Sequence, residues 1–212
     1  MAEFRAYPYF IKRAALKYLK GEHGKNEAQR LWYETLGHYA RFVEEAPDLG
    51  GKENKMSSNL YMALAVFALY EADGRRLTPD ALKRLISESV PKRIPVLSAA
   101  LDFNKPKNQE RLRARYERYK TISDKKLDSG QWGNSWRIEM NPHDRERGVA
   151  FDLVGCPLAD FAKKHGYTGI MPVLCGFDHL TAGLLHAKLI REHTVATGST
   201  YCDFWYLGDR EA

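Results

Sequence analysis

The hydrophobic periodicity of the sequence changes close to Gly130, and this change constrains the fold more than any other feature. From about residue 9 to residue 101, apolar side chains recur every three or four positions, which is typical of amphipathic helices. Residues 135–140 and 149–154 instead alternate or run apolar, which is typical of strands. The sequence therefore predicts a helical layer over residues 1–130, followed by a mixed α+β portion over residues 131–212 that carries the catalytic or ligand-binding site. We expect the two to form one integrated domain.

Turn and breaker residues divide the helical layer. A glycine-containing turn separates the helices expected at residues 6–19 and 26–45, and a third, strongly apolar helix is expected at residues 60–72. Pro91 and Pro95 are expected to break or kink the chain that follows.

The mixed portion predicts the order strand, strand, helix, helix, strand, strand. The helices are expected at residues 157–164 and 169–185, and the last two strands at residues 187–197 and 200–207. This order predicts an α+β fold in which an antiparallel sheet of about four strands carries two inserted helices.

Composition narrows the class of protein. The longest apolar window, residues 60–70, is much shorter than the roughly 20 residues that a membrane helix needs. Residues 1–5 show no basic segment followed by an apolar run, so we expect a cytoplasmic protein without a secretory signal. The three cysteines are an odd number, which favours reduced thiols over a disulfide framework.

The net charge of +6 is unevenly distributed along the chain. Residues 131–212 carry 8 Lys and Arg against 10 Asp and Glu, so the basic excess lies in the helical layer. Residues 105–126 combine arginines with tyrosines, as a nucleic-acid surface would, but Glu110 and Glu117 dilute the charge. We interpret this helix as scaffold. We expect a small-molecule substrate and neither a nucleic-acid nor a membrane partner. The sequence does not decide whether the protein forms a homo-oligomer.

One helical segment combines a thiol with potential catalytic partners. Asp178 follows Cys175 by three positions and His179 follows it by four, so a helix would place these side chains about one turn apart. A thiolate attacks electrophilic carbon well once its pKa is lowered. We therefore predict Cys175, Asp178 and His179 as catalytic residues. The alternative is a small buried cysteine beside two surface residues.

Substrate-binding candidates lie around this segment. They are Arg191, Thr194, Cys202, Asp203 and Cys156. Arg191 is the candidate for a substrate carboxylate, because a planar guanidinium binds a carboxylate through two parallel hydrogen bonds. Strand alternation is expected to place Arg191 on the same face as His193 and to separate Asp203 from Cys202.

A metal is the rival interpretation of the cysteines. The three thiols together with Asp178 or His179 offer donors for a tetrahedral zinc site. No Cys-x-x-Cys or His-x-x-x-His pair accompanies them, and such short spacings are what make these sites recognisable. We therefore expect no cofactor and no metal, with zinc as the lesser alternative.

Four segments resemble, in order and separation, the C-terminal signature of the L-2-amino-thiazoline-4-carboxylic acid hydrolase family. They are Gly155-Cys156-Pro157-Leu158-Ala159, Leu174-Cys175-Gly176-Phe177-Asp178, Arg191-Glu192-His193-Thr194-Val195-Ala196-Thr197-Gly198 and Cys202-Asp203-Phe204. The resemblance covers about residues 154–206, whereas the basic, proline-interrupted stretch at residues 91–126 departs from it. It implies hydrolytic opening of a 2-aminothiazoline ring to a carbamoyl-cysteine, on the route to L-cysteine. Such a reaction needs a nucleophile or activated water, a proton donor for the departing nitrogen, and an anchor for the substrate carboxylate.

A non-catalytic function is the alternative. The order of strands and helices is also similar to that of 4-vinyl-reductase-type small-molecule-binding domains, in which the cysteines would bind zinc or only pack. Such sensors usually carry a DNA-binding or ATPase domain, and this sequence shows none, so the enzyme is the favoured interpretation.

Overall fold

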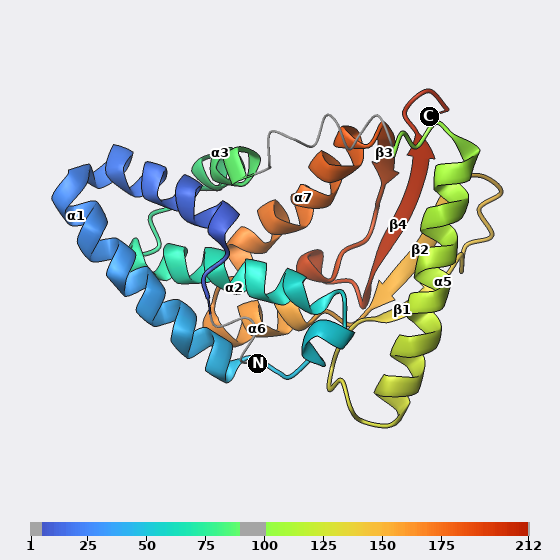
Figure 1. Cartoon of the computed structure of the whole chain (residues 1–212), viewed down its shortest axis with the longest axis horizontal. Helices are drawn as coiled ribbons and strands as arrows, with labels where there is room; N and C mark the ends of the chain where they lie inside the picture. The colour runs from blue at the N-terminus through green and yellow to red at the C-terminus, as the bar shows by residue number, and fades with distance from the viewer. Residues whose placement is uncertain (1–5, 90–100, 212) are drawn as a thin grey trace. The chain divides into compact units, whose positions relative to one another are not determined.

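The computed structural model describes residues 6–89 and 101–211 (Figure 1). The chain divides into two units, Met1–Pro91 and Lys92–Ala212. Pro91 and Pro95, for which a break was expected, lie outside the described residues, as do residues 1–5.

Helices make up the first unit. They are α1 (Tyr9–Glu45), the short 3-10 turn η2 (Gly51–Glu53), α2 (Ser57–Ala72) and α3 (Pro79–Ser89). The two segments expected at its start are one helix in α1 that is interrupted at Gly24, where φ is 76°. Glycine tolerates this left-handed conformation because it has no Cβ. Most of α2 is buried, including Leu64 and Phe67 at 0% exposure, which explains why its sequence is apolar on nearly every side.

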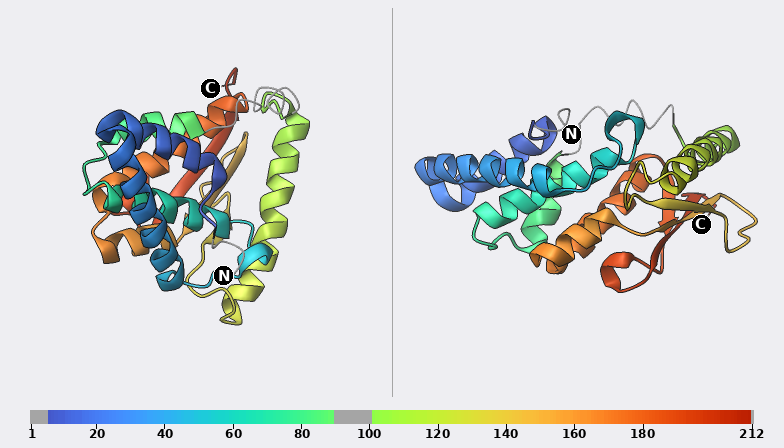
Figure 2. Two further views of the ribbon diagram at one scale, coloured as in Figure 1. Left: turned by 60° about the vertical axis from the view of Figure 1, so that its left-hand side comes forward. Right: turned by 90° about the horizontal axis from the view of Figure 1, so that it is seen from below.

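The second unit is built on a four-stranded antiparallel sheet with the order β1-β2-β4-β3. Its strands are β1 (Arg137–Met140), β2 (Val149–Val154), β3 (Ala187–Ile190) and β4 (Tyr201–Gly208). Its helices are α5 (Pro106–Asp128), α6 (Pro157–His165), α7 (Met171–Leu184) and the 3-10 turns η3 (Thr168–Ile170) and η4 (Val195–Thr197). The α+β fold with inserted helices is thus confirmed, and Figures 1 and 2 show α5 running alongside the sheet.

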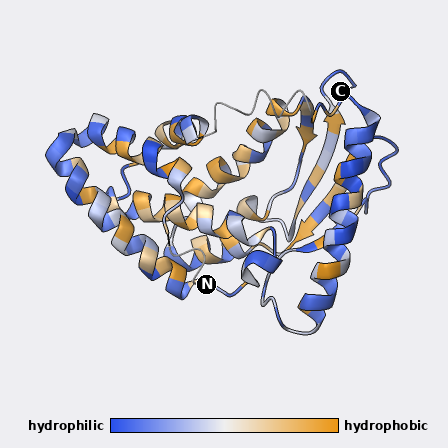
Figure 3. Ribbon diagram, in the orientation of Figure 1, coloured by the Kyte–Doolittle hydropathy of each residue, from blue (hydrophilic) through white to orange (hydrophobic). Residues whose placement is uncertain are grey.

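The register of β2 against β4 gives the sheet two different faces. Phe151 pairs with Phe204, and their rings stack with centroids 5.1 Å apart. Tyr116 of α5 stacks on Phe151 at 4.0 Å, so this apolar face packs against α5. Figure 3 shows that α5 is otherwise largely hydrophilic, as expected for a helix that buries a narrow stripe. Because side chains alternate along a strand, Asp152 and its partner Asp203 lie on the opposite, polar face.

The strand expected at residues 187–197 is shorter in the structure. β3 ends at Ile190, and the chain then passes through η4 before β4 begins. The cause is a competing side chain, because the Asp203 carboxylate accepts hydrogen bonds from the backbone N–H groups of Glu192 and His193. A carboxylate that takes up these donors removes the need for a strand ladder beyond Ile190.

Candidate functional site

The structure brings the three cysteines together on the apolar side of the sheet. Cys202 lies on β4 opposite Leu153, Cys156 precedes the first residue of α6, and Cys175 lies in the second turn of α7. All three are free thiols. The charges of Cys156 and Cys202 both raise the pKa of Cys175, so the thiols lie within electrostatic range of one another.

Arg191 connects this group of thiols to α7. Its Nη1 donates a hydrogen bond to Asp178 Oδ2 at 2.8 Å, and its Nη2 donates to the carbonyl oxygen of Cys175 at 2.5 Å. The guanidinium also lies over the ring of Phe204, 5.0 Å from its centroid. The side chain of Arg191 is only 4% exposed. We call Cys156, Cys175, Asp178, Arg191 and Cys202 the cysteine cluster.

Burial dominates the protonation of the thiols. It raises the pKa of Cys175 to about 12 and that of Cys156 to about 11, and it also raises the pKa of Cys202. Arg191 lowers the pKa of Cys175 in part, and the N–H of Val195, 3.2 Å from Cys202 Sγ, does the same for Cys202. The three thiols are therefore protonated at neutral pH in this arrangement.

Asp178 and His179 respond to the same surroundings. Burial raises the pKa of Asp178, although Arg191 opposes the shift and the side chain keeps 42% exposure. Partial burial and Arg191 both lower the pKa of His179. The helix expected around Cys175 is confirmed, yet within the described residues no hydrogen bond joins Cys175 Sγ to His179. The spacing of the segment is therefore as expected, whereas the thiol–imidazole contact is not formed.

Two tyrosines that the sequence did not suggest as site residues lie within electrostatic range of the cysteine cluster. Burial is the main cause of the raised pKa of both Tyr116 and Tyr206, and the charge of Asp178 acts in the same direction, so both hydroxyls are held protonated. Both are carried by elements of the apolar face, α5 and β4. Only the pairing of α5 with the sheet brings Tyr116 here, and a single sequence does not reveal that pairing.

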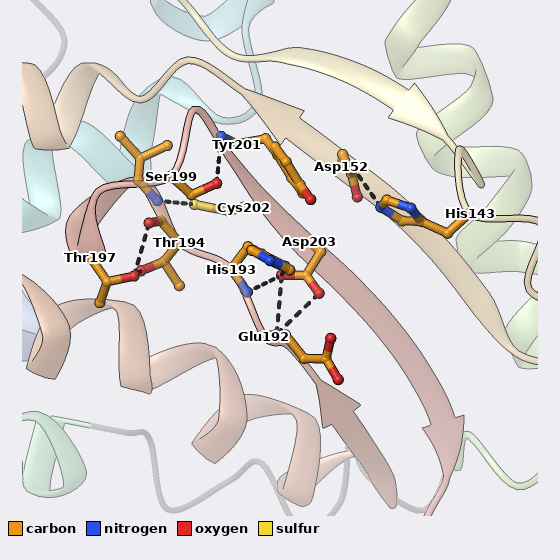
Figure 4. A network of polar contacts seen from close by, with 11 residues as sticks. His143, Asp152, Glu192, His193, Thr194, Thr197, Ser199, Tyr201, Cys202 and Asp203 are labelled. Atoms are coloured by element: carbon orange, nitrogen blue, oxygen red, sulfur yellow. Dashed lines mark hydrogen bonds and ion pairs between the residues drawn. The ribbon is translucent and has the colours of Figure 1, made fainter.

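Thr194 and Asp203 lie apart from the thiols. Thr194 Oγ1 is 3.0 Å from Thr197 Oγ1, a contact within the turn that contains η4. Asp203 lies on the polar face, with Oδ1 2.6 Å from the N–H of His193 (Figure 4). The separation of Asp203 from Cys202 by strand alternation is confirmed, but the alternation expected for Arg191 and His193 is not, because β3 ends before them.

A second group of polar side chains lies on the polar face of the sheet, and the sequence did not predict it as a site. We call it the Asp152 cluster, and it comprises His143, Asp152, His193, Tyr201 and Asp203. His143 Nε2 lies 3.0 Å from Asp152 Oδ2, and the Tyr201 ring lies between the two imidazoles, 6.1 Å from His143 and 5.4 Å from His193 (Figure 4). The signal in the sequence was an aspartate within an otherwise apolar strand.

The surroundings of Asp152 favour its protonated form. Burial raises its pKa, and the neighbouring charges of Asp203 and Glu139 act in the same direction. The ion pair and hydrogen bond with His143 oppose the shift. Asp152 therefore takes up a proton more readily than an exposed aspartate would.

The structure also bears on metals and membranes. Across residues 6–89 and 101–211, no group of three or more His, Cys, Asp or Glu side chains is placed to hold a metal ion. In the same ranges, no helix has the length and apolar character needed to cross a bilayer.

Comparison with known proteins identifies a family. A family model described as L-2-amino-thiazoline-4-carboxylic acid hydrolase matches residues 58–206, which is well over half of the chain. The matched region contains every residue of both clusters. No curated protein and no solved structure matches the chain.

Proposed function

This chain belongs to the L-2-amino-thiazoline-4-carboxylic acid hydrolase family, and on that premise we propose that it opens L-2-amino-thiazoline-4-carboxylate, or a closely related cyclic amidine, to a carbamoyl-cysteine. The observation that carries the proposal is the grouping of three thiols around the Arg191–Asp178 pair within the matched region. The product would stand one hydrolytic step from L-cysteine, which fits the cytoplasmic role expected from the sequence.

Cys175 is the proposed nucleophile. Its sulfur would add to the amidine carbon between the ring sulfur and nitrogen, and the bond from that carbon to the ring nitrogen would break. Water would then add to the same carbon and displace the Cys175 sulfur, so that one water is consumed and every substrate atom stays in the product. The thiol must first lose its proton, because its pKa lies near 12 without substrate.

His179 is the proposed acceptor of that proton. Its lowered pKa keeps the imidazole neutral at pH 7, and it lies one helical turn from Cys175. Binding of a substrate with a protonated amidine would assist, since a nearby cation favours the thiolate. Tyr116, held protonated beside Asp178, is the proposed donor to the departing nitrogen.

Arg191 is the proposed anchor for the substrate carboxylate. A guanidinium carries five N–H donors, and its bonds to Asp178 and to the Cys175 carbonyl use two of them. Its burial gives a charge-assisted bond more strength than the same bond would have in water. Cys156 and Cys202 would line the same site, and Thr194 and Asp203 would act on it through the turn before β4.

The test is turnover of the purified protein with L-2-amino-thiazoline-4-carboxylate, followed by the mass of the ring-opened product. Cys175→Ser should abolish turnover, whereas Cys156→Ser, in the same cluster, should reduce it by less than tenfold. Metal content should be measured on the same samples. Activity that follows bound zinc would replace the nucleophile with a metal-activated water and make the cysteines its ligands.

One observation favours a second candidate function. All three thiols have raised pKa values, as expected for buried structural cysteines, whereas reactive cysteines usually have lowered ones. Specific binding of L-2-amino-thiazoline-4-carboxylate without turnover, unaffected by Cys175→Ser, would favour a small-molecule-binding domain of 4-vinyl-reductase type.

A further inference from the structure

We propose that the Asp152 cluster is a second ligand site, which binds a small organic cation with N–H donors, of the amidinium or primary ammonium class. This inference does not rest on the proposed hydrolase activity. Asp152 and Asp203 lie on the polar face of the sheet, whereas Cys202 lies on the apolar face. The sheet therefore separates this site from the cysteine cluster.

The buried carboxylate of Asp152 has an unused hydrogen-bond acceptor. Asp152 is 4% exposed, and its Oδ2 is paired with His143. Its Oδ1 is buried and has no hydrogen-bond partner among the described residues. A buried carboxylate oxygen without a donor costs about 1–3 kcal/mol or more, so native structures rarely keep one unless it serves a purpose. A ligand N–H would supply the missing donor.

Acidic side chains gather on this part of the polar face. Glu139 pairs with Asp152 across β1 and β2, and Asp152 pairs with Asp203 across β2 and β4. Directly opposed residues in antiparallel strands point to the same face, so three carboxylates form a row across three strands. This row would repel an anion, and a cation would relieve the repulsion between its members. The contrast with the net charge of +6 of the whole chain makes the acidic row a local feature.

Aromatic rings surround the carboxylates of this site. The side chains of His143 and His193 are 41% and 50% exposed, whereas those of Asp152 and Asp203 are 6% and 13% exposed. The carboxylates thus lie beneath a rim formed by the two imidazoles and the Tyr201 ring (Figure 4). Aromatic faces attract organic cations, which adds to the selectivity for charge.

Access of a ligand to the Asp152 carboxylate depends on His143. Its imidazole covers Asp152 from the connection between β1 and β2, and residues 141–147 of that connection are exposed. Exposed side chains change rotamer on the picosecond to nanosecond timescale, so the ring can turn aside without movement of the strands. His143 therefore acts as a cover that the ligand displaces from one oxygen while it binds the other.

The experiment measures binding of acetamidinium chloride to the full chain by NMR, through the imidazole proton shifts of His143 and His193. Tetramethylammonium chloride, a cation without N–H groups, is the control ligand. We expect saturable shifts with acetamidinium and at least tenfold weaker binding of tetramethylammonium. Asp152→Asn should weaken acetamidinium binding at least tenfold, and Glu146→Gln, which removes an exposed carboxylate from the same connection, should change it less than twofold.

His143→Ala keeps the test decisive if Asp152→Asn does not fold. Without its cover, Asp152 should bind acetamidinium at least as tightly as in the wild type, with the shift read at His193. Equal shifts with both cations would reduce the effect to general screening and overturn the proposal. Absence of saturable binding in the wild type would also overturn it, whatever the outcome of the turnover assay.

Discussion

Arg191 donates a hydrogen bond to Asp178 at 2.8 Å and thereby joins the end of β3 to helix α7. The same guanidinium holds the carbonyl oxygen of Cys175, so one buried side chain fixes the position of the proposed nucleophile. An arginine expected to serve the substrate thus has a structural task as well. Its substitution should affect both stability and catalysis.

Loss of Arg191 should destabilise the protein. Arg191→Ala would leave Asp178 and the Cys175 carbonyl without their donor, and we expect a loss of about 2–3 kcal/mol in the free energy of unfolding, discounted because Asp178 is 42% exposed. Urea unfolding measures it. Arg30→Ala, which breaks an exposed pair on α1, should cost far less. Equal losses for the two variants would show that the Arg191 contacts contribute nothing special.

Turnover by a Cys175 thiolate should rise with pH. Burial and the two neighbouring thiols raise the pKa of Cys175 to about 12, so the thiolate fraction increases about tenfold per pH unit below that value. The value of kcat/KM should therefore climb from pH 7 to pH 10, with circular dichroism confirming that the fold persists. A plateau reached by pH 8 would mean that the nucleophile is a group with a lower pKa in the free protein, because kcat/KM reports the ionisations of the free enzyme.

The sequence predicted the elements well and their pairings less well. The α+β order around Cys156 and the helix carrying Cys175 follow from local periodicity, which a single sequence contains. The early end of β3 at Ile190 depends on the Asp203 carboxylate, more than ten residues further along the chain. Local patterns do not contain such a long-range competitor.

The contrast between local patterns and long-range pairing also explains why the sequence predicted the cysteine cluster in part and did not predict the Asp152 cluster. Cys175 and Asp178 were grouped by helical spacing, whereas the pairing of Asp152 with Asp203 depends on the register of two strands far apart in the sequence. The buried aspartate in β2 was visible as a break in an apolar run, but its partners were not. His143 reaches it only through the connection between β1 and β2.

Gly148 should be irreplaceable where β2 begins. Its φ is 74°, and a Cβ there would lie 2.1 Å from the carbonyl oxygen of Tyr206, a backbone atom that cannot move aside cheaply. We expect Gly148→Ala to cost at least about 3 kcal/mol in the free energy of unfolding. Gly130→Ala is the matched control, because Gly130 has a φ of 72° but no atom within 4 Å of the added Cβ. It should cost only about 1 kcal/mol. Similar losses in urea unfolding would mean that backbone strain, and not the clash with β4, sets the effect.

Asp152 should make the protein less stable as pH rises. Burial raises its pKa in the folded state above the ordinary value of 3.8, so the folded state holds this proton more tightly than the unfolded state. The contribution of Asp152 is therefore most favourable below pH 3.8 and falls as pH rises through the folded-state pKa. Asp152→Asn, which cannot ionise, should gain stability relative to the wild type over that range.

Asp102 has the opposite shift, because the backbone N–H of Asn104 lowers its pKa. The stability that Asp102 contributes is therefore present above pH 3.8 and is lost as pH falls through its folded-state pKa. Asp102→Asn should thus lose stability relative to the wild type as pH rises. Urea unfolding of the wild type and the two variants between pH 3.5 and 7 measures how each stability difference changes with pH. Differences that change in the same direction for both variants would show that burial does not raise the pKa of Asp152.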